Sequence, residues 1–371
     1  MITTQISRTY LLSALLLLLV GCSRSLQTGR LDTGSCEQVF LPRFIAQDDG
    51  SLNCQWVEFH RDSIGGAGAT WNPAAQTFDS TRGYGFIERQ YVVCVPELVR
   101  WTNREHGTAT FVAHSCIQEC FMVWQDSLGK REAAWLAAPA VQTYPLKVDS
   151  LFVVLHESST EDGLIVVWMD RRGRELSRDT LALPGPDHAA AVGGGVTMVK
   201  GYDDHFTIYH IGRACSWVDS AIVQRAYTAR ASLGTDYFVQ DGELVMVSGY
   251  APTRDAVEFE TFYIAGAKVQ SHHTASAELR GGEPYVACRA VATGGEFPLI
   301  VALAQSAEGS ELVLLAQNSE GAWALEASAA VEPTIQEFCA AESGEDILVA
   351  YTAATEQSAA VNSCRWLRFQ H

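Results

Sequence analysis

Residues 123–129 read VWQDSLG and residues 167–173 read VWMDRRG. The same pattern returns in residues 59–66, FHRDSIGG, and in residues 316–321, AQNSEG. Each copy is the end of a strand-like run, often aromatic, followed by Asp or Asn and then by Gly. An Asp or Asn side chain bonds its own backbone in a type I turn, and Gly accepts the left-handed conformation before the return strand. The pattern therefore predicts a recurrent β-hairpin turn.

We predict that the residues of this turn are structural, because the local backbone explains each of them. A catalytic role for the aspartates is the less favoured interpretation. The predicted turn residues are Asp62, Gly65, Asp126, Gly129, Asp170, Gly173, Asn318 and Gly321.

Weaker copies of the unit keep the strand and the turn without the Asp, at residues 206–212, 244–252 and 348–355. The turns then recur about every 49 residues on average. A period of about 40–50 residues with three or four strands per unit is typical of a β-propeller blade. We interpret the two longest intervals as holding insertions, at residues 64–84 and 265–283.

These patterns predict an all-β fold, a β-propeller of seven blades over residues 36–371. Six or eight blades are alternatives, and two stacked β-sandwich domains would give similar strand spacing. The domain resembles bacterial extracytoplasmic β-propeller proteins. It lacks the Gly-His and Trp-Asp pairs of WD40 repeats and the double glycine of kelch repeats, so the resemblance assigns no subfamily.

The N-terminus has the pattern of an export signal. Residues 1–21 contain one basic residue, Arg8, and no acidic residue, and residues 11–20 form a mainly apolar run. A helix of that length spans about 15 Å, half of a bilayer core, which is typical of a signal peptide and too short to cross a membrane. The run ends in Leu19-Val20-Gly21-Cys22, which resembles the lipobox of bacterial lipoproteins.

The lipobox resemblance implies that the signal peptide, residues 1–21, is removed and that Cys22 carries the lipid. Two or three acyl chains would hold the protein on a membrane without crossing it. Ser23 follows the cysteine, and in such lipoproteins a residue other than Asp at this place implies the outer membrane. Residues 22–35 are mainly polar, which predicts a flexible tether between the anchor and the domain.

The other nine cysteines agree with export, because some cysteines pair in an oxidising compartment. Nine is odd, so at least one of them stays free or pairs between chains. Cys116 and Cys120 lie close together across a predicted turn, and we name them as the candidate disulfide. A metal site at these two residues is the alternative, although no second pair of ligands accompanies them.

The chain has 26 Lys and Arg against 43 Asp and Glu, which gives a net charge of −17. A surface this acidic repels phosphate backbones, so we expect no nucleic acid as a partner. The sequence has no Asp-box of the sialidase type, no nucleophile elbow and no P-loop. We therefore expect no cofactor, no metal and no catalytic residue.

Two groups of side chains are weak candidates for binding. Asp203, Asp204 and His205 adjoin one another in a predicted turn and could bind a cation or exchange protons, although a solvated turn is the favoured interpretation. Trp71 and Trp101 lie among Gly, Asn and Thr residues, and we predict that they are exposed for contact with a ligand.

Three functions fit these observations. The favoured one is a lipid-anchored module of the cell envelope that binds or scaffolds envelope proteins. The first alternative is a carbohydrate-binding protein or a glycan-active enzyme, which would show acids and aromatic rings together on one part of the propeller. The second alternative is a structural surface lipoprotein without a defined ligand.

The lipobox interpretation has a direct test. Changing Cys22 to Ala removes the thiol that carries the lipid, so we expect an uncleaved or mislocalised precursor. Membrane fractionation followed by immunoblotting measures this. Normal fractionation of the variant would show that the protein is not anchored through Cys22.

Overall fold

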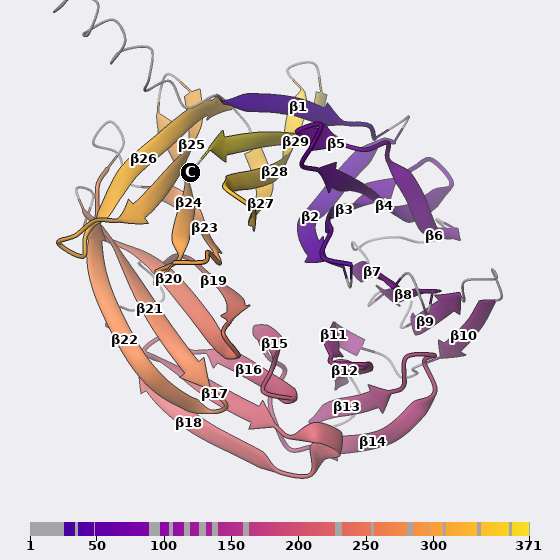
Figure 1. Ribbon diagram of the computed structural model, residues 1–371. Helices are drawn as coiled ribbons and strands as arrows, with labels where there is room; N and C mark the ends of the chain where they lie inside the picture. Colours follow the sequence, from indigo (N-terminus) through magenta and orange to yellow (C-terminus); the bar gives the residue numbers. More distant parts are fainter. Residues whose placement is uncertain are drawn as a thin grey trace, which may run out of the picture.

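Antiparallel strands make up nearly all of the described chain, and their sheets follow one another in a ring around a central axis (Figure 1). The predicted all-β propeller is therefore confirmed. The alternative prediction of two stacked β-sandwich domains is wrong, because the sheets follow one another around one ring instead of packing face to face in pairs. The computed structural model describes residues 26–33, 36–47, 49–88, 97–103, 107–114, 119–125, 131–135, 140–158, 163–226, 232–253, 256–279, 285–295, 297–306, 309–331, 335–355 and 358–370.

The described strands group into four-stranded antiparallel units that follow the chain order. The first unit consists of β2 (Gln38–Ala46), β3 (Leu52–Phe59), β4 (Ser63–Asn72) and β5 (Thr77–Phe78), with β6 (Arg82–Glu88) also paired to β4, and the closing unit consists of β27 (Ile335–Ser343), β28 (Asp346–Thr355) and β29 (Ser358–Gln370) together with β1 (Gln27–Leu31). The two units that follow the first are β7 (Glu97–Asn103), β8 (Gly107–His114), β9 (Glu119–Gln125) and β10 (Arg131–Trp135), and then β11 (Ala140–Val148), β12 (Leu151–Ser158), β13 (Leu164–Met169) and β14 (Glu175–Leu181). The units before the closing one are β15 (His188–Val192), β16 (Gly195–Gly201), β17 (His205–Ile211) and β18 (Val218–Gln224), with the single-turn helix η1 (Arg213–Cys215); β19 (Ser232–Gln240), β20 (Glu243–Thr253), β21 (Ala256–Ala265) and β22 (Lys268–Ala277); and β23 (Tyr285–Val291), β24 (Leu299–Ser306), β25 (Gly309–Gln317) and β26 (Trp323–Val331).

This grouping agrees with the predicted seven blades, but the blade number stays a prediction. The units β19–β22 and β23–β26 are joined into one eight-stranded sheet. The junction is a single parallel pair between Ala277 and Trp323.

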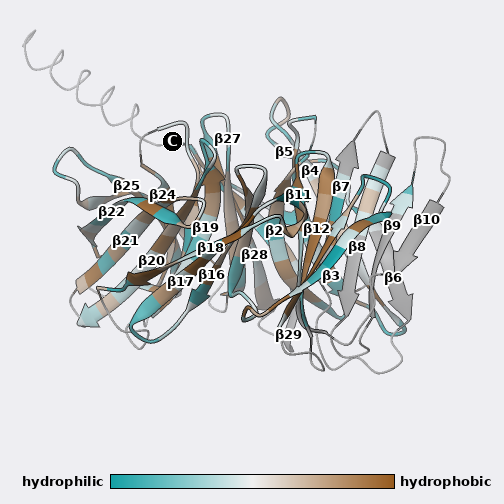
Figure 2. Cartoon of the chain, turned by 90° about the horizontal axis from the view of Figure 1, so that it is seen from below, coloured by the Kyte–Doolittle hydropathy of each residue, from teal (hydrophilic) through white to brown (hydrophobic). Residues whose placement is uncertain are grey.

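Strand sequences follow their position in each unit. The third strand β13, LIVVWM, is buried along its whole length, whereas the outer strand β14, ELSRDTL, is exposed at alternate residues. A strand that packs on both faces against neighbouring units needs apolar residues throughout, and an outer strand needs them on one face only. Figure 2 shows brown, hydrophobic segments along many of the strands and teal, hydrophilic segments at strand ends and in loops.

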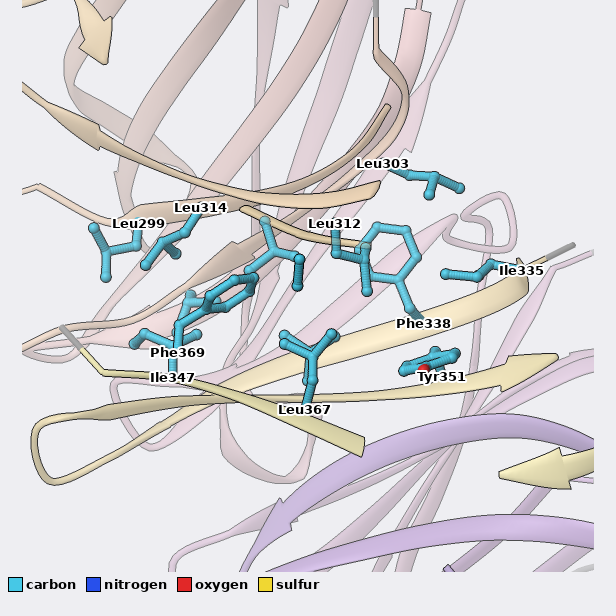
Figure 3. Packing of buried hydrophobic residues seen from close by; sticks show 14 of the residues in the cluster. Leu299, Leu303, Leu312, Leu314, Ile335, Phe338, Ile347, Tyr351, Leu367 and Phe369 are labelled. Carbon is cyan, nitrogen blue, oxygen red and sulfur yellow. The ribbon is translucent and has the colours of Figure 1, made fainter. Parts of the chain in front are cut away.

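Buried side chains fill the space between neighbouring units. Figure 3 shows one such cluster, in which Leu303 and Leu314 of one unit lie together with Phe338, Tyr351 and Leu367 of the next. None of these five side chains is more than 4% exposed. Burial of a side chain of this size contributes about 1.5–3 kcal/mol, so the contacts between units are a main source of stability.

The ring is closed by strands from both ends of the chain. Strand β1 pairs with β29, from Gln27 opposite Arg368 to Leu31 opposite Cys364. The prediction of a flexible tether over residues 22–35 is therefore wrong for β1, and the folded domain begins before residue 36. The error has a physical cause, since β1 is short and polar and acquires its structure only from a strand more than 300 residues away.

The predicted turn is found at two of the three places that the structure describes. Asp170 Oδ1 accepts hydrogen bonds from the backbone N–H groups of Arg172 and Arg174, at 2.8 and 3.0 Å. Gly173 has a φ of 78°, which L-residues rarely adopt.

The turn at Asn318 has the same bonds, since its Oδ1 accepts from the N–H groups of Glu320 and Ala322, both at 3.0 Å. Gly321 has a φ of 84°.

The predicted turn at Asp62 differs from these two. Asp62 lies in the bend before β4, but Gly65 lies inside β4 and pairs with Glu58, so its prediction as a turn residue is wrong. The bend is closed one residue after Asp62, by a bond from the N–H of His60 to the carbonyl of Ser63 at 2.8 Å. Asp126 and Gly129 lie outside the described residues.

The two predicted insertions are also wrong. Residues 64–84 belong to β4, β5 and β6, and residues 265–283 include β22. The intervals between predicted turns are long at these two places because the turns that were compared lie between different strands of their units. Asp62 lies between the second and third strands of its unit, whereas Asp170 lies between the third and fourth.

Within the described part of the chain, no helix is long and apolar enough to span a membrane. Cys22 and the rest of the predicted signal peptide lie outside the described residues.

The closure by β1 predicts that Leu31 stabilises the fold. Its side chain is 2% exposed in a cluster with Trp71 and Trp366, so we expect Leu31→Ala to lower the free energy of unfolding by about 2–4 kcal/mol. Leu26→Ala is the matched control, because Leu26 is 45% exposed and its truncation should cost no more than about 0.5 kcal/mol. Denaturant unfolding measures both. Equal effects of the two changes would contradict the closure.

Candidate functional site: the central cavity

A cavity of about 690 Å³ lies where the first strands of four units approach one another. Its wall is contributed by β2, β19, β23 and β27. The volume is that of a site for a small molecule or for a few side chains of a partner. Charged residues in the wall include Asp236, Arg289 and Glu337.

Asp236 joins two units at the cavity. Its Oδ2 accepts a hydrogen bond from the N–H of Ala290 at 2.9 Å, and its Oδ1 accepts one from the N–H of Tyr237 at 3.0 Å. Burial raises the pKa of this carboxyl, while the charge of Arg289 and the two N–H bonds act in the opposite direction. The carboxyl is thereby fixed in position between β19 and β23.

Arg289 is one of two arginines in the wall, together with Arg43. Its Nε donates to the carbonyl of Phe338 at 3.0 Å and its Nη1 donates to the carbonyl of Cys288 at 2.8 Å. The guanidinium also lies over the ring of Phe338, 5.1 Å from the ring centroid. These contacts hold a planar cation with further N–H groups toward the cavity, a geometry suited to carboxylate or carbonyl oxygens.

Glu337 fixes a strained part of β2. Its Oε2 accepts a hydrogen bond from the N–H of Leu41 at 2.6 Å. Leu41 has a φ of 51° and lies where the pairing of β2 with β3 shifts register. A bulge at this place turns the strand and shapes the cavity wall.

His188 packs against Tyr237 of the cavity wall, with ring centroids 4.8 Å apart. Burial lowers the pKa of His188 to about 4, Arg289 acts in the same direction, and Asp187 acts against both. The imidazole is therefore neutral at physiological pH and can donate one hydrogen bond and accept another.

A smaller hollow of about 340 Å³ lies between the first two units. Gln55 in its wall donates to the carbonyl of Arg100 at 2.7 Å and accepts from the N–H of Arg100 at 3.0 Å. These bonds tie β3 to β7, so the side-chain amide of Gln55 is already used within the fold. The central cavity is the stronger candidate because it is larger and combines aromatic rings with charge.

The candidate residues Asp203, Asp204 and His205 lie apart from this cavity, in the turn between β16 and β17. The N–H of Tyr202 donates to the carbonyl of His205 at 2.8 Å, and His205 Nδ1 lies 2.7 Å from Asp204 Oδ1. The bond to His205 holds the pKa of the Asp204 carboxyl below its usual range. Asp204 is fully exposed, so this group has the properties of the solvated turn that the sequence favours.

The two tryptophans are packing residues, so their predicted exposure is wrong. Trp71 is 3% exposed and lies edge-on to Phe78 and Trp366, with ring centroids at 5.1 and 5.5 Å. Trp101 packs against Phe152 with a centroid distance of 5.3 Å. Their Gly- and Asn-rich surroundings are strand segments in this fold, not loops.

The described cysteines contain no disulfide, since Cys36, Cys54, Cys215, Cys288, Cys339 and Cys364 are all free thiols. Cys116 lies outside the described residues, and so does the predicted pair that it forms with Cys120. Among the residues that the structure describes, no group of His, Cys, Asp and Glu could hold a metal ion.

Sequence reasoning missed the residues that carry the charge of the cavity. Asp236, Arg289 and Glu337 each lie in the first strand of a unit, within the segments SLGTDYFVQ, YVACRAV and IQEFCAAES. A charged residue inside an otherwise strand-like first segment is the signal that could have identified them. It becomes visible only once the units are aligned by their strands instead of by their turns.

No family model matches the sequence, and no curated protein matches it. Solved structures resemble it in fold. A streptogramin B lyase matches with a TM-score of 0.51 and 9% identity, over 93% of this chain and 97% of that one. A virginiamycin B lyase from Staphylococcus aureus has a TM-score of 0.47 and 9% identity, over 92% and 98% of the two chains. The NanB sialidase of Streptococcus pneumoniae has a TM-score of 0.46 and 10% identity, over 91% and 69%. At such low identity the likeness shows the fold alone.

The lowered pKa of His188 predicts a loss of stability in acid. Because the folded pKa of about 4 lies below the unfolded value of 6.5, the unfolded chain takes up the proton first as the pH falls between these values. We expect His188→Gln to lessen the fall in the free energy of unfolding by about 2 kcal/mol between neutral pH and about pH 5. Denaturant unfolding at both pH values measures this, and identical pH dependence in variant and wild type would contradict the assignment.

Proposed function

We propose that the protein is a lipid-anchored β-propeller of the bacterial cell envelope, held at the outer membrane through Cys22, and that it acts as a protein-binding or scaffolding module. The partner contacts the central cavity. The observation that carries the proposal is the charged cavity wall, in which Asp236, Arg289 and Glu337 are each held by bonds to backbone groups. A wall that is already ordered favours recognition, because little conformational entropy is lost on binding.

The hydrogen bonds that Asp236 and Glu337 accept favour a role in binding over a role in acid–base catalysis. Asp236 accepts from two N–H groups and Glu337 from one. A general base must present an oxygen to the proton that it removes, whereas these carboxyls are used to join one unit to the next. Their charge can still orient a partner.

Exposed apolar side chains favour a protein as the partner. Val239 of β19 and Val286 of β23 are 42% and 47% exposed, and both lie on strands that line the central cavity. Interfaces between proteins combine apolar contact with a few fixed charges, and Arg is enriched among the residues that contribute most to them.

Arg289→Gln tests the proposal. The change removes the charge of Arg289 and leaves a shorter side chain that still forms hydrogen bonds, so we expect about tenfold less partner to be recovered. The measurement is a crosslinked pull-down of the lipidated protein from its own membranes, with quantitative mass spectrometry.

Arg178→Gln is the matched control, because Arg178 lies on the outer strand β14 and pairs with Glu175. It should recover as much partner as the wild type. The melting temperature of each variant shows whether it has folded, because Arg289 also binds two carbonyls. A folded Arg289→Gln protein that recovers its partner in full would contradict a role for the cavity.

A glycan ligand is the second candidate, and one observation favours it. The cavity wall brings the aromatic side chains of Tyr237, Phe238 and Phe338 close to Asp236 and Arg289. Aromatic rings with a few fixed polar groups are typical of sites for small ligands, sugars included. Binding on a glycan array that is lost in Arg289→Gln would favour this candidate, and failure of both the array and the pull-down would favour a structural surface lipoprotein.

A further inference from the structure

Three cysteines from distant parts of the sequence meet beside the cavity, at the junction between the first unit and the closing unit. They are Cys54 of β3, Cys339 of β27 and Cys364 of β29. The neighbouring thiols of Cys339 and Cys364 both act to raise the pKa of the Cys54 thiol, in addition to its burial. Cys54 and Cys364 belong to one buried cluster, which also contains Leu31 of β1, and Cys339 packs against it.

The three thiols differ in how a reagent can reach them. Cys54 and Cys364 are fully buried. Cys339 is only partly buried, and it lines the central cavity. Burial raises the pKa of the Cys54 thiol well above its usual value, which keeps it protonated and slow to react by itself. A reagent in the cavity therefore meets Cys339 first.

We propose that Cys339 and Cys54 are a redox pair that forms an internal disulfide through the cavity. The thiolate of Cys339 attacks a disulfide R–S–S–R′, which belongs to an oxidised small thiol or to a disulfide oxidoreductase. This step forms the mixed disulfide Cys339–S–S–R and releases R′–SH. The sulfur of Cys54 then attacks the sulfur of Cys339 after losing its proton, and R–SH leaves. In total two cysteine thiols are oxidised and one disulfide is reduced to two thiols.

The bond would connect β3 of the first unit to β27 of the closing unit. It would therefore add a covalent link between the two units that the chain joins where it passes from β1 to β2. A disulfide that closes a loop of this length restricts the unfolded chain strongly. The inference concerns a modification of the fold and stands independently of the ligand of the cavity.

The test uses the full purified chain. The reduced protein is incubated with oxidised glutathione, free thiols are alkylated, and the protein is digested without reduction for mass spectrometry. We expect a peptide pair joined through Cys54 and Cys339, with Cys364 and Cys288 alkylated. The melting temperature should rise by about 3–5 °C and return on reduction with dithiothreitol.

Variants separate the alternatives. Cys339→Ala, at the cavity wall, should abolish both the crosslink and the rise in melting temperature, whereas Cys364→Ala should retain both. Cys288→Ala is the control, because Cys288 is also buried but contacts the carbonyl of Gly234 instead of another thiol. It should behave as the wild type does.

Three results would overturn the proposal. One is a stable glutathione adduct on Cys339 with Cys54 alkylated. Another is a crosslink between Cys54 and Cys364 that persists in Cys339→Ala. The third is the expected crosslink without any change in melting temperature, which would show that the bond does not reinforce the junction.

Discussion

The pairing of β1 with β29 is the constraint on which the rest of the structure depends. A propeller is a ring, and each unit is stabilised by burying its two faces against its neighbours. The last unit can do so only if strands from both ends of the chain meet. The contact is specific, because a Cβ atom at Gly29 would lie 2.5 Å from Nε1 of Trp366. Arg368 of β29, 3% exposed, forms an ion pair with Asp346 at 2.9 Å and donates to the side chain of Gln27 at 3.1 Å.

The same ring explains how the cavity acquires its chemistry. Side chains of one unit bond backbone groups of the next, as Asp236 does with Ala290 and Glu337 with Leu41. Tyr144 does the same farther round the ring, donating to the carbonyl of Pro186 at 2.6 Å. Such bonds require polar side chains on the first strands, close to the axis. The charged wall of the cavity thus includes side chains that hold neighbouring units together, which gives a binding site with fixed geometry.

How much the sequence could predict depends on the range of the interactions involved. The turns at Asp170 and Asn318 follow from bonds within five residues, so the local pattern was sufficient. The prediction of a repeating unit was also correct, because the described units repeat the same order of antiparallel strands. Gly65 was misplaced because a Gly after an Asp can also lie in a strand, as the pairing with Glu58 shows. Trp71, β1 and the cavity could not be predicted, since each depends on residues from other units or from the opposite end of the chain.

The closure of the ring by β1 is most directly tested by native-state hydrogen exchange of the backbone amides. If residues 27–31 are the outer strand of the last unit, their hydrogen-bonded amides exchange with protection of the same order as amides of β29 opposite them. Exchange at the rate of an unstructured peptide, with β29 still protected, would show that the ring is held together without the N-terminal strand and would contradict the account.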